Sequence, residues 1–282
     1  MEGSTNEELA RSVCNRLALA LGGELGAGAF KQTFLVTDKS GQRFALKIVT
    51  ADFDSQRLAR EVAAMKKCSH AGIARLVDYR VEPWSGHKFC WLLEEFIAGG
   101  TLRSRLNRLG TLPLEEIRSL GIELSSALAH IASLNLVHRD LKPDNIMYRK
   151  MDGLPVIVDF GLVRNLQDVS LTKTWLAQGP GTPYYSPPEQ LVNQKELIDW
   201  RSDQFSLGIT LALAGSGHHP YAALTDTALG HAVERVANRE DTSVEFKQWV
   251  KDSGLTVLAR MVRPWPVQRY RRPEDLVSAW GK

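Results

Sequence analysis

The most constraining feature of this sequence is a polar segment of eight residues, H-R-D-L-K-P-D-N, which runs from His138 to Asn145. The tripeptide D-F-G, which begins at Asp159, follows it closely. Two carboxylates and one amide on two loops can bind a divalent metal ion and accept a proton from a hydroxyl group. Lys142 can neutralise phosphate charge. The two segments predict phosphoryl transfer, because its transition state mainly requires positioning and charge neutralisation.

Together the two segments resemble those of the eukaryotic-type (Hanks-type) Ser/Thr protein kinase family. The sequence P-P-E-Q at 187–190 is reminiscent of bacterial members. The resemblance implies an α+β bilobal kinase fold, with a small antiparallel β-sheet lobe carrying one main helix and a mainly helical large lobe. A polar loop beside a glycine-ended strand is the simpler alternative, but two motifs in the right order disfavour it.

Length and composition fit such a chain. Its 282 residues can form one large domain or two lobes, and 44% hydrophobic and 24% charged residues are ordinary for a soluble globular protein. The net charge of +3 is too small to indicate nucleic-acid or membrane binding. No apolar run is long enough for a membrane span. Cys14, Cys68 and Cys90 match no metal spacing and indicate packed, reduced thiols in a cytoplasmic protein.

We expect one kinase domain over residues 21–280, with a helical extension at 1–20, a small lobe at 21–98 and a large lobe at 99–282. Apolar residues recur at helical spacing from Asn6 to Leu21 and predict a helix there. No repeat or low-complexity tail is expected.

A glycine-rich segment, L-G-A-G-A-F-K, runs from Leu25 to Lys31. Glycines allow a hairpin backbone to approach phosphates closely. The pattern is weak alone, but it precedes a lysine-bearing strand as the kinase pattern requires. By resemblance, Gly26 and Gly28 contact ATP phosphates and Thr33 replaces the valine over adenine. Lys31 replaces the third glycine, which predicts a stiffer loop.

The segment from Arg43 to Val49 alternates like a half-buried strand. It matches the V-A-I-K segment of the family, which implies that Ala45 contacts adenine and Lys47 holds the α- and β-phosphates. A lysine in an apolar strand needs a partner, and Glu61 of the next expected helix is in register to reach it. For either residue alone, a surface position would be the default interpretation.

The expected hinge between the lobes follows, where the resemblance assigns main-chain bonds with adenine to Glu95 and Ile97. Glu94 falls where the family usually has an apolar residue or threonine. A buried carboxylate must be paired or protonated, and Lys47 is the nearest plausible cation. We hypothesise that Glu94 competes with Glu61 for Lys47 and favours an inactive arrangement. A register error of one residue is the alternative.

The catalytic roles are also implied by the resemblance. Asp140 would accept the proton of the attacking hydroxyl, and Lys142 indicates Ser/Thr specificity. Asn145 and Asp159 would bind Mg²⁺ (or Mn²⁺), and Met147 would lie under adenine.

A segment rich in hydroxyl groups follows Asp159, as expected of an activation segment. Arg139 requires an anion, and phosphorylation of Ser170, Thr172 or Thr174 could supply it. Self-association for trans-autophosphorylation would then be possible. Most loop hydroxyls, however, are unmodified.

Two further features concern the large lobe. Glu189 is expected to pair with Arg269, and Asp203 to anchor the catalytic loop backbone. Three arginines form a basic cluster at positions 103, 105 and 108, for which a solvated helix face is a simpler interpretation than docking of an acidic or phosphorylated partner.

The sequence therefore predicts an ATP-dependent Ser/Thr protein kinase that acts on protein substrates. A pseudokinase-like nucleotide-binding module is disfavoured by the complete catalytic set, although Lys31, Thr33 and Glu94 keep it open. A small-molecule phosphotransferase of the aminoglycoside type is disfavoured by the intact H-R-D-x-K-P and G-T…P-E patterns.

Overall fold

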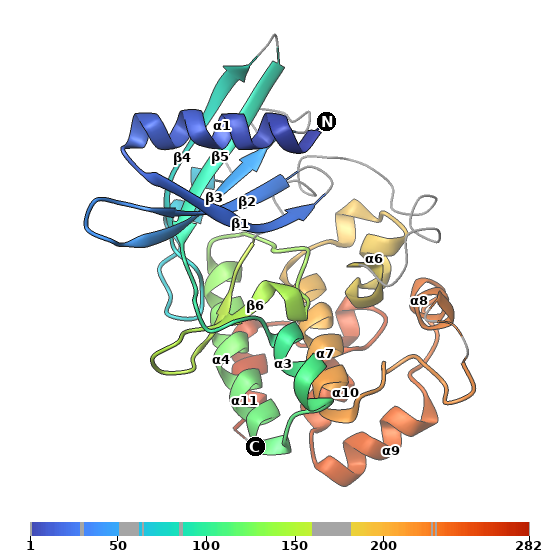
Figure 1. The fold of residues 1–282 in the computed structure, drawn as a ribbon. Coiled ribbons are helices and arrows are strands. Elements are labelled where there is room, and N and C mark those ends of the chain that lie inside the picture. The colour runs from blue at the N-terminus through green and yellow to red at the C-terminus, as the bar shows by residue number, and fades with distance from the viewer. Residues whose placement is uncertain are drawn as a thin grey trace. The chain divides into compact units, whose positions relative to one another are not determined.

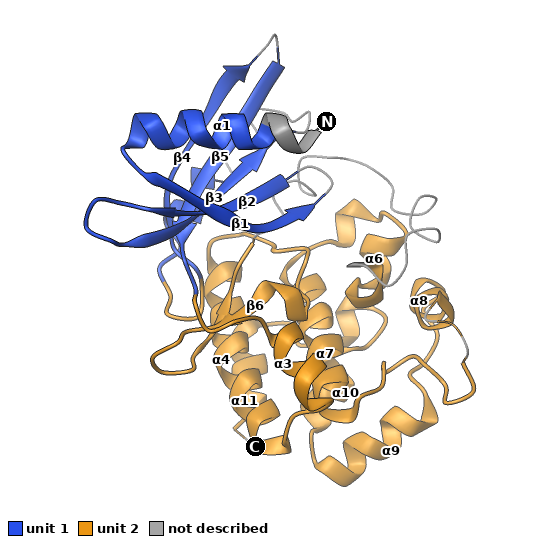
Figure 2. Ribbon diagram, in the orientation of Figure 1, with its two compact units in different colours: residues 1–69, 74–97, 162–168 blue, residues 70–73, 98–161, 169–282 orange. Residues whose placement is uncertain are grey.

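A computed structural model describes residues 2–28, 31–50, 62–63, 65–84, 87–159, 182–226, 228 and 230–281. The chain forms two compact units (Figure 2). Unit 1 comprises the described parts of residues 1–69 and 74–97, and unit 2 those of 70–73, 98–161 and 169–282. The chain passes from unit 1 to the main part of unit 2 between Ile97 and Ala98, within the expected hinge segment. Across the described residues, every helix is too short or too polar to cross a membrane.

Unit 1 is an antiparallel five-stranded sheet with the spatial order β1-β2-β3-β5-β4 and a helix, α1. Its described elements are α1 (Glu2–Leu17), β1 (Ala20–Gly28), β2 (Lys31–Thr37), β3 (Arg43–Val49), β4 (Leu76–Trp84) and β5 (His87–Glu95).

One face of this sheet packs against α1, which lies across the strands in Figure 1. Alternation within β2 buries Phe34 and Val36 on this face and leaves Thr33 half-buried on the other. The shared core comprises Leu9, Ala10, Val13, Cys14, Phe34, Val36, Phe44, Leu46, Ile48, Phe89, Trp91 and Leu93. The N-terminal helix is thus an integral part of the small-unit core.

α1 ends at Leu17, so the expected helix to Leu21 was wrong at its C-terminal end. Ala18 adopts a left-handed φ of 54°, and the Leu19 N–H donates to the Cys14 carbonyl at 2.9 Å. Leu21 already belongs to β1 but still packs against the same core. The apolar residues of α1 and β1 belong to one cluster, so hydrophobic spacing alone did not show the boundary between the helix and the strand.

The three cysteines are free and buried, as expected. Burial raises the pKa of the Cys90 thiol to about 12, so it stays protonated at neutral pH.

Unit 2 is mainly helical and contains one small hairpin. Its described elements are α3 (Leu102–Leu109), α4 (Leu114–Ser133), η1 (Pro143–Asn145), β6 (Ile146–Tyr148), β7 (Pro155–Ile157), η2 (Thr182–Tyr185), α6 (Pro188–Leu191), η3 (Lys195–Leu197), α7 (Trp200–Ser216), α8 (Gly230–Ala237), α9 (Val244–Ser253), α10 (Thr256–Met261), η4 (Pro266–Gln268) and α11 (Pro273–Ala279).

Helices α4 and α7 form the centre of unit 2. Nearly every residue of α7 from Ser202 to Ala214 is buried, which explains its lack of a polar stripe. The C-terminal end of the chain closes on α4, because Trp280 packs over Gly121 and its indole N–H donates to Ser125 Oγ at 2.9 Å. A side chain at Gly121 would collide with the indole ring. This core supports the catalytic loop described below.

Candidate active site

In unit 1, the predicted nucleotide-binding residues of β2 and β3 share one face of the sheet. Thr33 lies directly opposite Lys47, and Ala45 precedes Lys47 by two residues on the same side. This face is opposite to the one that packs on α1. The structure therefore brings Thr33, Ala45 and Lys47 together.

The glycine-rich segment forms a β1–β2 hairpin. Gly26 pairs with Thr33, and Gly28 pairs with Lys31. Counting only the described residues, a Cβ atom at Gly26 would meet nothing within 4 Å, and the nearest atom to one at Gly28 would be 3.8 Å away. Packing within the described part of unit 1 therefore does not require glycine at these two positions. Close approach of the backbone to a ligand is consistent with their presence.

Lys47 pairs with Glu94 in the interior of unit 1. Lys47 Nζ lies 2.5 Å from Glu94 Oε2, and the two side chains are 8% and 6% exposed. Ala45 is the partner of Glu94 in the β3–β5 register, so the two charged residues are diagonal neighbours on one face. The expected pairing of a buried Glu94 with Lys47 is confirmed.

The hinge residues lie at the end of unit 1. Glu95 closes β5, and its N–H donates to the Arg75 carbonyl at 2.9 Å. Ile97 is buried. The predicted partner Glu61 lies outside the described residues, as do Phe160, Gly161 and the three candidate phosphorylation sites Ser170, Thr172 and Thr174.

In unit 2, the catalytic loop holds the Asp140 carboxylate between two side chains. Lys142 Nζ lies 2.9 Å from Asp140 Oδ2. Asn145 Nδ2 donates to the same oxygen at 3.1 Å and to the Asp140 carbonyl at 2.8 Å. The carboxylate is therefore oriented by one ammonium and one amide, and two predicted catalytic residues and one predicted metal ligand come together.

The backbone of this loop is anchored by Asp203 of α7, as the sequence predicted. The buried Asp203 carboxylate accepts from the His138 N–H at 2.7 Å and from the Arg139 N–H at 2.8 Å. These bonds hold Arg139 in a left-handed conformation with a φ of 64°. Burial raises the pKa of Asp203 to about 7, although the two N–H donors oppose that shift.

The predicted metal ligands lie at one end of the β6–β7 hairpin. The Val158 N–H donates to the Asn145 carbonyl at 3.0 Å, and Asp159 follows immediately with a φ of 64°. Because the Asn145 Nδ2 is engaged with Asp140, its side-chain oxygen remains for a metal ion. An amide oxygen and a carboxylate fit Mg²⁺, which prefers oxygen ligands. Met147 lies half-buried in β6.

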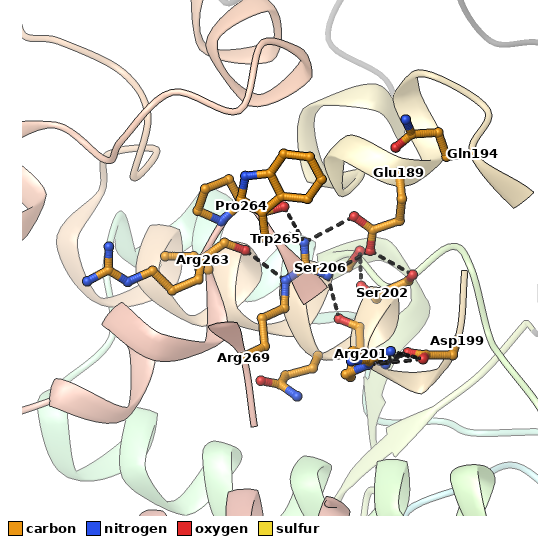
Figure 3. Close-up of polar contacts among 12 residues, drawn as sticks. Glu189, Gln194, Asp199, Arg201, Ser202, Ser206, Arg263, Pro264, Trp265 and Arg269 are labelled. Carbon is orange, nitrogen blue, oxygen red and sulfur yellow. Dashed lines mark hydrogen bonds and ion pairs between the residues drawn. The ribbon is translucent and has the colours of Figure 1, made fainter. Parts of the chain in front are cut away.

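The expected pair of Glu189 and Arg269 is confirmed and fully buried (Figure 3). Arg269 contacts both carboxylate oxygens, at 2.7 and 3.1 Å, and Ser202 Oγ donates to the same carboxylate at 2.8 Å. The other guanidinium N–H groups donate to backbone carbonyls. These carbonyls belong to Arg201, Arg263 and Pro264. All five donors of Arg269 are thus satisfied.

Sequence reasoning missed two supports of the segment after residue 182. Arg103 of α3 donates to Asp144 at 3.2 Å and to the Tyr185 hydroxyl at 2.6 Å. The buried His219 contacts the Tyr184 carbonyl through Nε2 at 3.0 Å. The basic cluster of α3 was the only available signal, and its interpretation as a solvated face was wrong for Arg103.

Comparison with known proteins places the site in context. A family model described as "Protein kinase domain" matches residues 19–280. The chain is 35% identical over 204 residues to the Ser/Thr protein kinase AfsK of Streptomyces griseus, which covers 71% of this chain and 24% of that protein. It is 30% identical over 271 residues to the Ser/Thr protein kinase PknA of Nostoc sp., which covers 90% of this chain and 45% of that protein. The chain thus spans less than half the length of these relatives.

Among solved structures, a crystal structure of Rad53 1–466 in complex with AMP-PNP matches with a TM-score of 0.71 and 22% sequence identity. The match covers 93% of this chain and 65% of that chain. This similarity confirms the expected bilobal kinase fold. Neither the relatives nor the family model favours the two alternative functions.

Proposed function

The chain belongs to the protein kinase family, and from this premise we propose that it is a Ser/Thr protein kinase that transfers the γ-phosphate of ATP to protein hydroxyl groups. The observation that carries this proposal is the Asp140 carboxylate, held by Lys142 and Asn145 in a loop anchored to α7. A carboxylate that is fixed in this way can receive a proton at a defined point.

Asp140 orients the substrate hydroxyl and accepts its proton during transfer. A positioned base of this kind contributes about a hundred- to ten-thousandfold in rate. Lys142 orients the carboxylate from 2.9 Å and presents positive charge to the transferred group. Asn145 fixes the same carboxylate through its amide N–H.

Asn145 and Asp159 are the residues that would hold Mg²⁺ or Mn²⁺. When bound, the metal ion supplies charge neutralisation at the phosphate oxygens. Within the described residues, no group of three or more His, Cys, Asp or Glu could hold a metal. A small set of protein ligands agrees with Mg²⁺, which usually retains water and substrate oxygens as ligands.

The remaining predicted residues bind the nucleotide in this proposal. Gly26 and Gly28 give their backbone to the phosphates, and Lys47 pairs with the α- and β-phosphates. The space that the described residues leave beside Gly26 supports the first role. Adenine is contacted by Thr33, Ala45, Glu95, Ile97 and Met147.

The contact of Lys47 with Glu94 favours a second candidate, a nucleotide-binding module with weak or no transfer. A lysine that is paired with a buried carboxylate is less available to phosphates. We reconcile the two by assigning Glu94 a regulatory role: it competes with Glu61 and the nucleotide for Lys47. Phosphorylation of Ser170, Thr172 or Thr174 by a second copy of the chain would shift this balance.

Incubation of the chain with radiolabelled ATP, Mg²⁺ and a generic basic protein tests the proposal. Phosphosite mass spectrometry should find label on Ser and Thr of the chain or of the added protein. ATP binding without any transfer would support the nucleotide-binding module instead. In a parallel incubation to which an aminoglycoside is added, labelling of the aminoglycoside alone would support a small-molecule phosphotransferase.

A further inference from the structure

A basic groove lies in unit 2 between α3 and the β6–β7 hairpin, and its cavity measures about 500 Å³. Its walls are joined by backbone hydrogen bonds from Gly99 N–H to the Tyr148 carbonyl at 2.8 Å and from Tyr148 N–H to the Gly100 carbonyl at 3.0 Å. A side chain at Gly99 would collide with the Tyr148 backbone, so glycine permits this approach. We define the groove by five of its lining residues, Arg105, Arg108, Tyr148, Arg149 and Lys150.

The groove concentrates positive charge from two elements. Arg105 and Arg108 come from α3, whereas Arg149 and Lys150 follow β6. None of the described lining residues is acidic. Glu116 of α4 pairs with Arg105 at 2.9 Å and offsets one of the four cations. The groove therefore attracts an anion.

Two lining residues each carry a buried donor that lacks a hydrogen-bond partner among the described residues, namely the Tyr148 hydroxyl and Arg105 Nε. Tyr148 is only 7% exposed, and the Arg105 guanidinium lies 5.2 Å from the centre of its ring. Burial raises the pKa of Tyr148 to about 12, so its hydroxyl remains a donor at neutral pH. Buried donors are normally satisfied, so Arg105 and Tyr148 carry donors for which the described residues supply no acceptor.

We propose that the basic groove binds the phosphoryl group of a phosphorylated protein segment. A phosphoryl group carries a charge of about −2 and three acceptor oxygens, whereas a carboxylate offers one charge and two oxygens. Arginine clusters are suited to it because guanidinium groups bind phosphate bidentately. The cavity volume is many times the roughly 30 Å³ that one water molecule occupies in the liquid. The residues beside the phosphoryl group therefore fit in the cavity as well. This binding requires no phosphate transfer, so it stands independently of the proposed activity.

The test is retention of peptide libraries on the immobilised full chain without ATP. One library carries a central phosphothreonine with randomised flanks, and matched libraries carry threonine or aspartate at that position. We expect selective retention of the phosphothreonine library. The charge reversal Arg108→Glu with Lys150→Glu should weaken binding of a selected peptide by at least about tenfold, because both rim cations would then repel the phosphate.

A matched double variant, Lys251→Glu with Arg271→Glu, makes the same charge change at two exposed positions elsewhere in unit 2. It should bind the peptide as the unmodified chain does. Equal retention of the threonine or aspartate library, or no retention of any, would overturn the proposal. So would an equal loss in both double variants, or displacement of the peptide by inorganic phosphate at an equal concentration, because a free ion would then be the ligand.

Discussion

Lys47 Nζ lies 2.5 Å from Glu94 Oε2, and both side chains are more than nine-tenths buried in unit 1. The pair joins adjacent strands of the sheet on the face that carries Thr33 and Ala45. Removing one partner from a buried ion pair is costly, because the other charge loses compensation in a region of low polarity. Glu94 therefore affects both the stability of unit 1 and the availability of Lys47.

Glu94→Met should lower the melting temperature of the nucleotide-free chain, with a loss of unfolding free energy of about 3 kcal/mol. ATP with Mg²⁺ should stabilise this variant more than the unmodified chain, because its phosphates replace the lost negative charge. Thermal unfolding with and without nucleotide measures both effects. Glu115→Gln, at an exposed position of α4, is the control. Unchanged nucleotide affinity and activity in Glu94→Met would refute the regulatory role.

Arg269→Lys should strongly destabilise unit 2, although it conserves the charge. Lysine has three donors and cannot reproduce the bidentate contact with Glu189 or all of the carbonyl contacts. We expect a loss of about 3–5 kcal/mol in urea-induced unfolding. Arg272→Lys alters an exposed pair with Asp275 and should have little effect. Similar midpoints for both variants would contradict the structural role of the buried pair.

The stability of the chain should depend on pH through His219. Burial lowers its pKa to about 4, and the neutral ring accepts from the Tyr221 N–H through Nδ1 and contacts the Tyr184 carbonyl through Nε2. Because the folded pKa lies below the unfolded value near 6.5, this stabilisation is complete above pH about 6.5 and is lost as the pH falls toward 4. Its size is of order 3 kcal/mol.

His219→Gln should remove this loss, so lowering the pH from 6.5 to 4 should reduce its unfolding free energy by less than it reduces that of the unmodified chain. The neighbouring His218→Gln, at an exposed position, is the matched control and should leave the dependence unchanged. Equal slopes for the unmodified chain and His219→Gln would show that another group is responsible.

Asn145→Ala removes a donor to Asp140 and a predicted metal ligand. The variant should lose about a hundredfold in kcat and require a higher Mg²⁺ concentration, because positioning of the base and metal binding are both impaired. Steady-state rates over a Mg²⁺ titration measure this. Asn15→Ala on the exposed side of α1 is the control. Removal of divalent metal with EDTA should abolish transfer, and Mg²⁺ or Mn²⁺ should restore it; transfer that persists in EDTA would exclude the metal role.

Local sequence patterns predicted those helices and strands whose structure is determined by their own residues. β3 occupies the predicted range from Arg43 to Val49, because alternation along a half-buried strand is a strong signal. Helix α4 carries the same kind of local signal, because apolar residues such as Ile117, Leu124 and Ile131 recur in it at helical spacing and are buried. The boundary at Ala18 was missed, because neither glycine nor asparagine marks its left-handed conformation.

The motifs also identified contacts between distant residues, such as Asp203 with the catalytic loop, because the family resemblance carries that information. Contacts outside the motifs could not be predicted. The approach of Tyr148 to Arg105 depends on how the β6–β7 hairpin lies against α3, and nothing in either segment specifies it. Similarly, the sequence marks Arg103 as basic but does not show its contact with Tyr185, which is 82 residues away.

The most direct test of the account is single-turnover transfer by Asp140→Asn, with nucleotide affinity measured in parallel. Asp252→Asn, at an exposed position of α9, is the control. We predict that Asp140→Asn binds ATP with Mg²⁺ normally but transfers phosphate to Ser or Thr at least about a hundredfold more slowly, whereas the control retains full activity. Transfer by Asp140→Asn at the rate of the unmodified chain would contradict the assignment of Asp140 as the base.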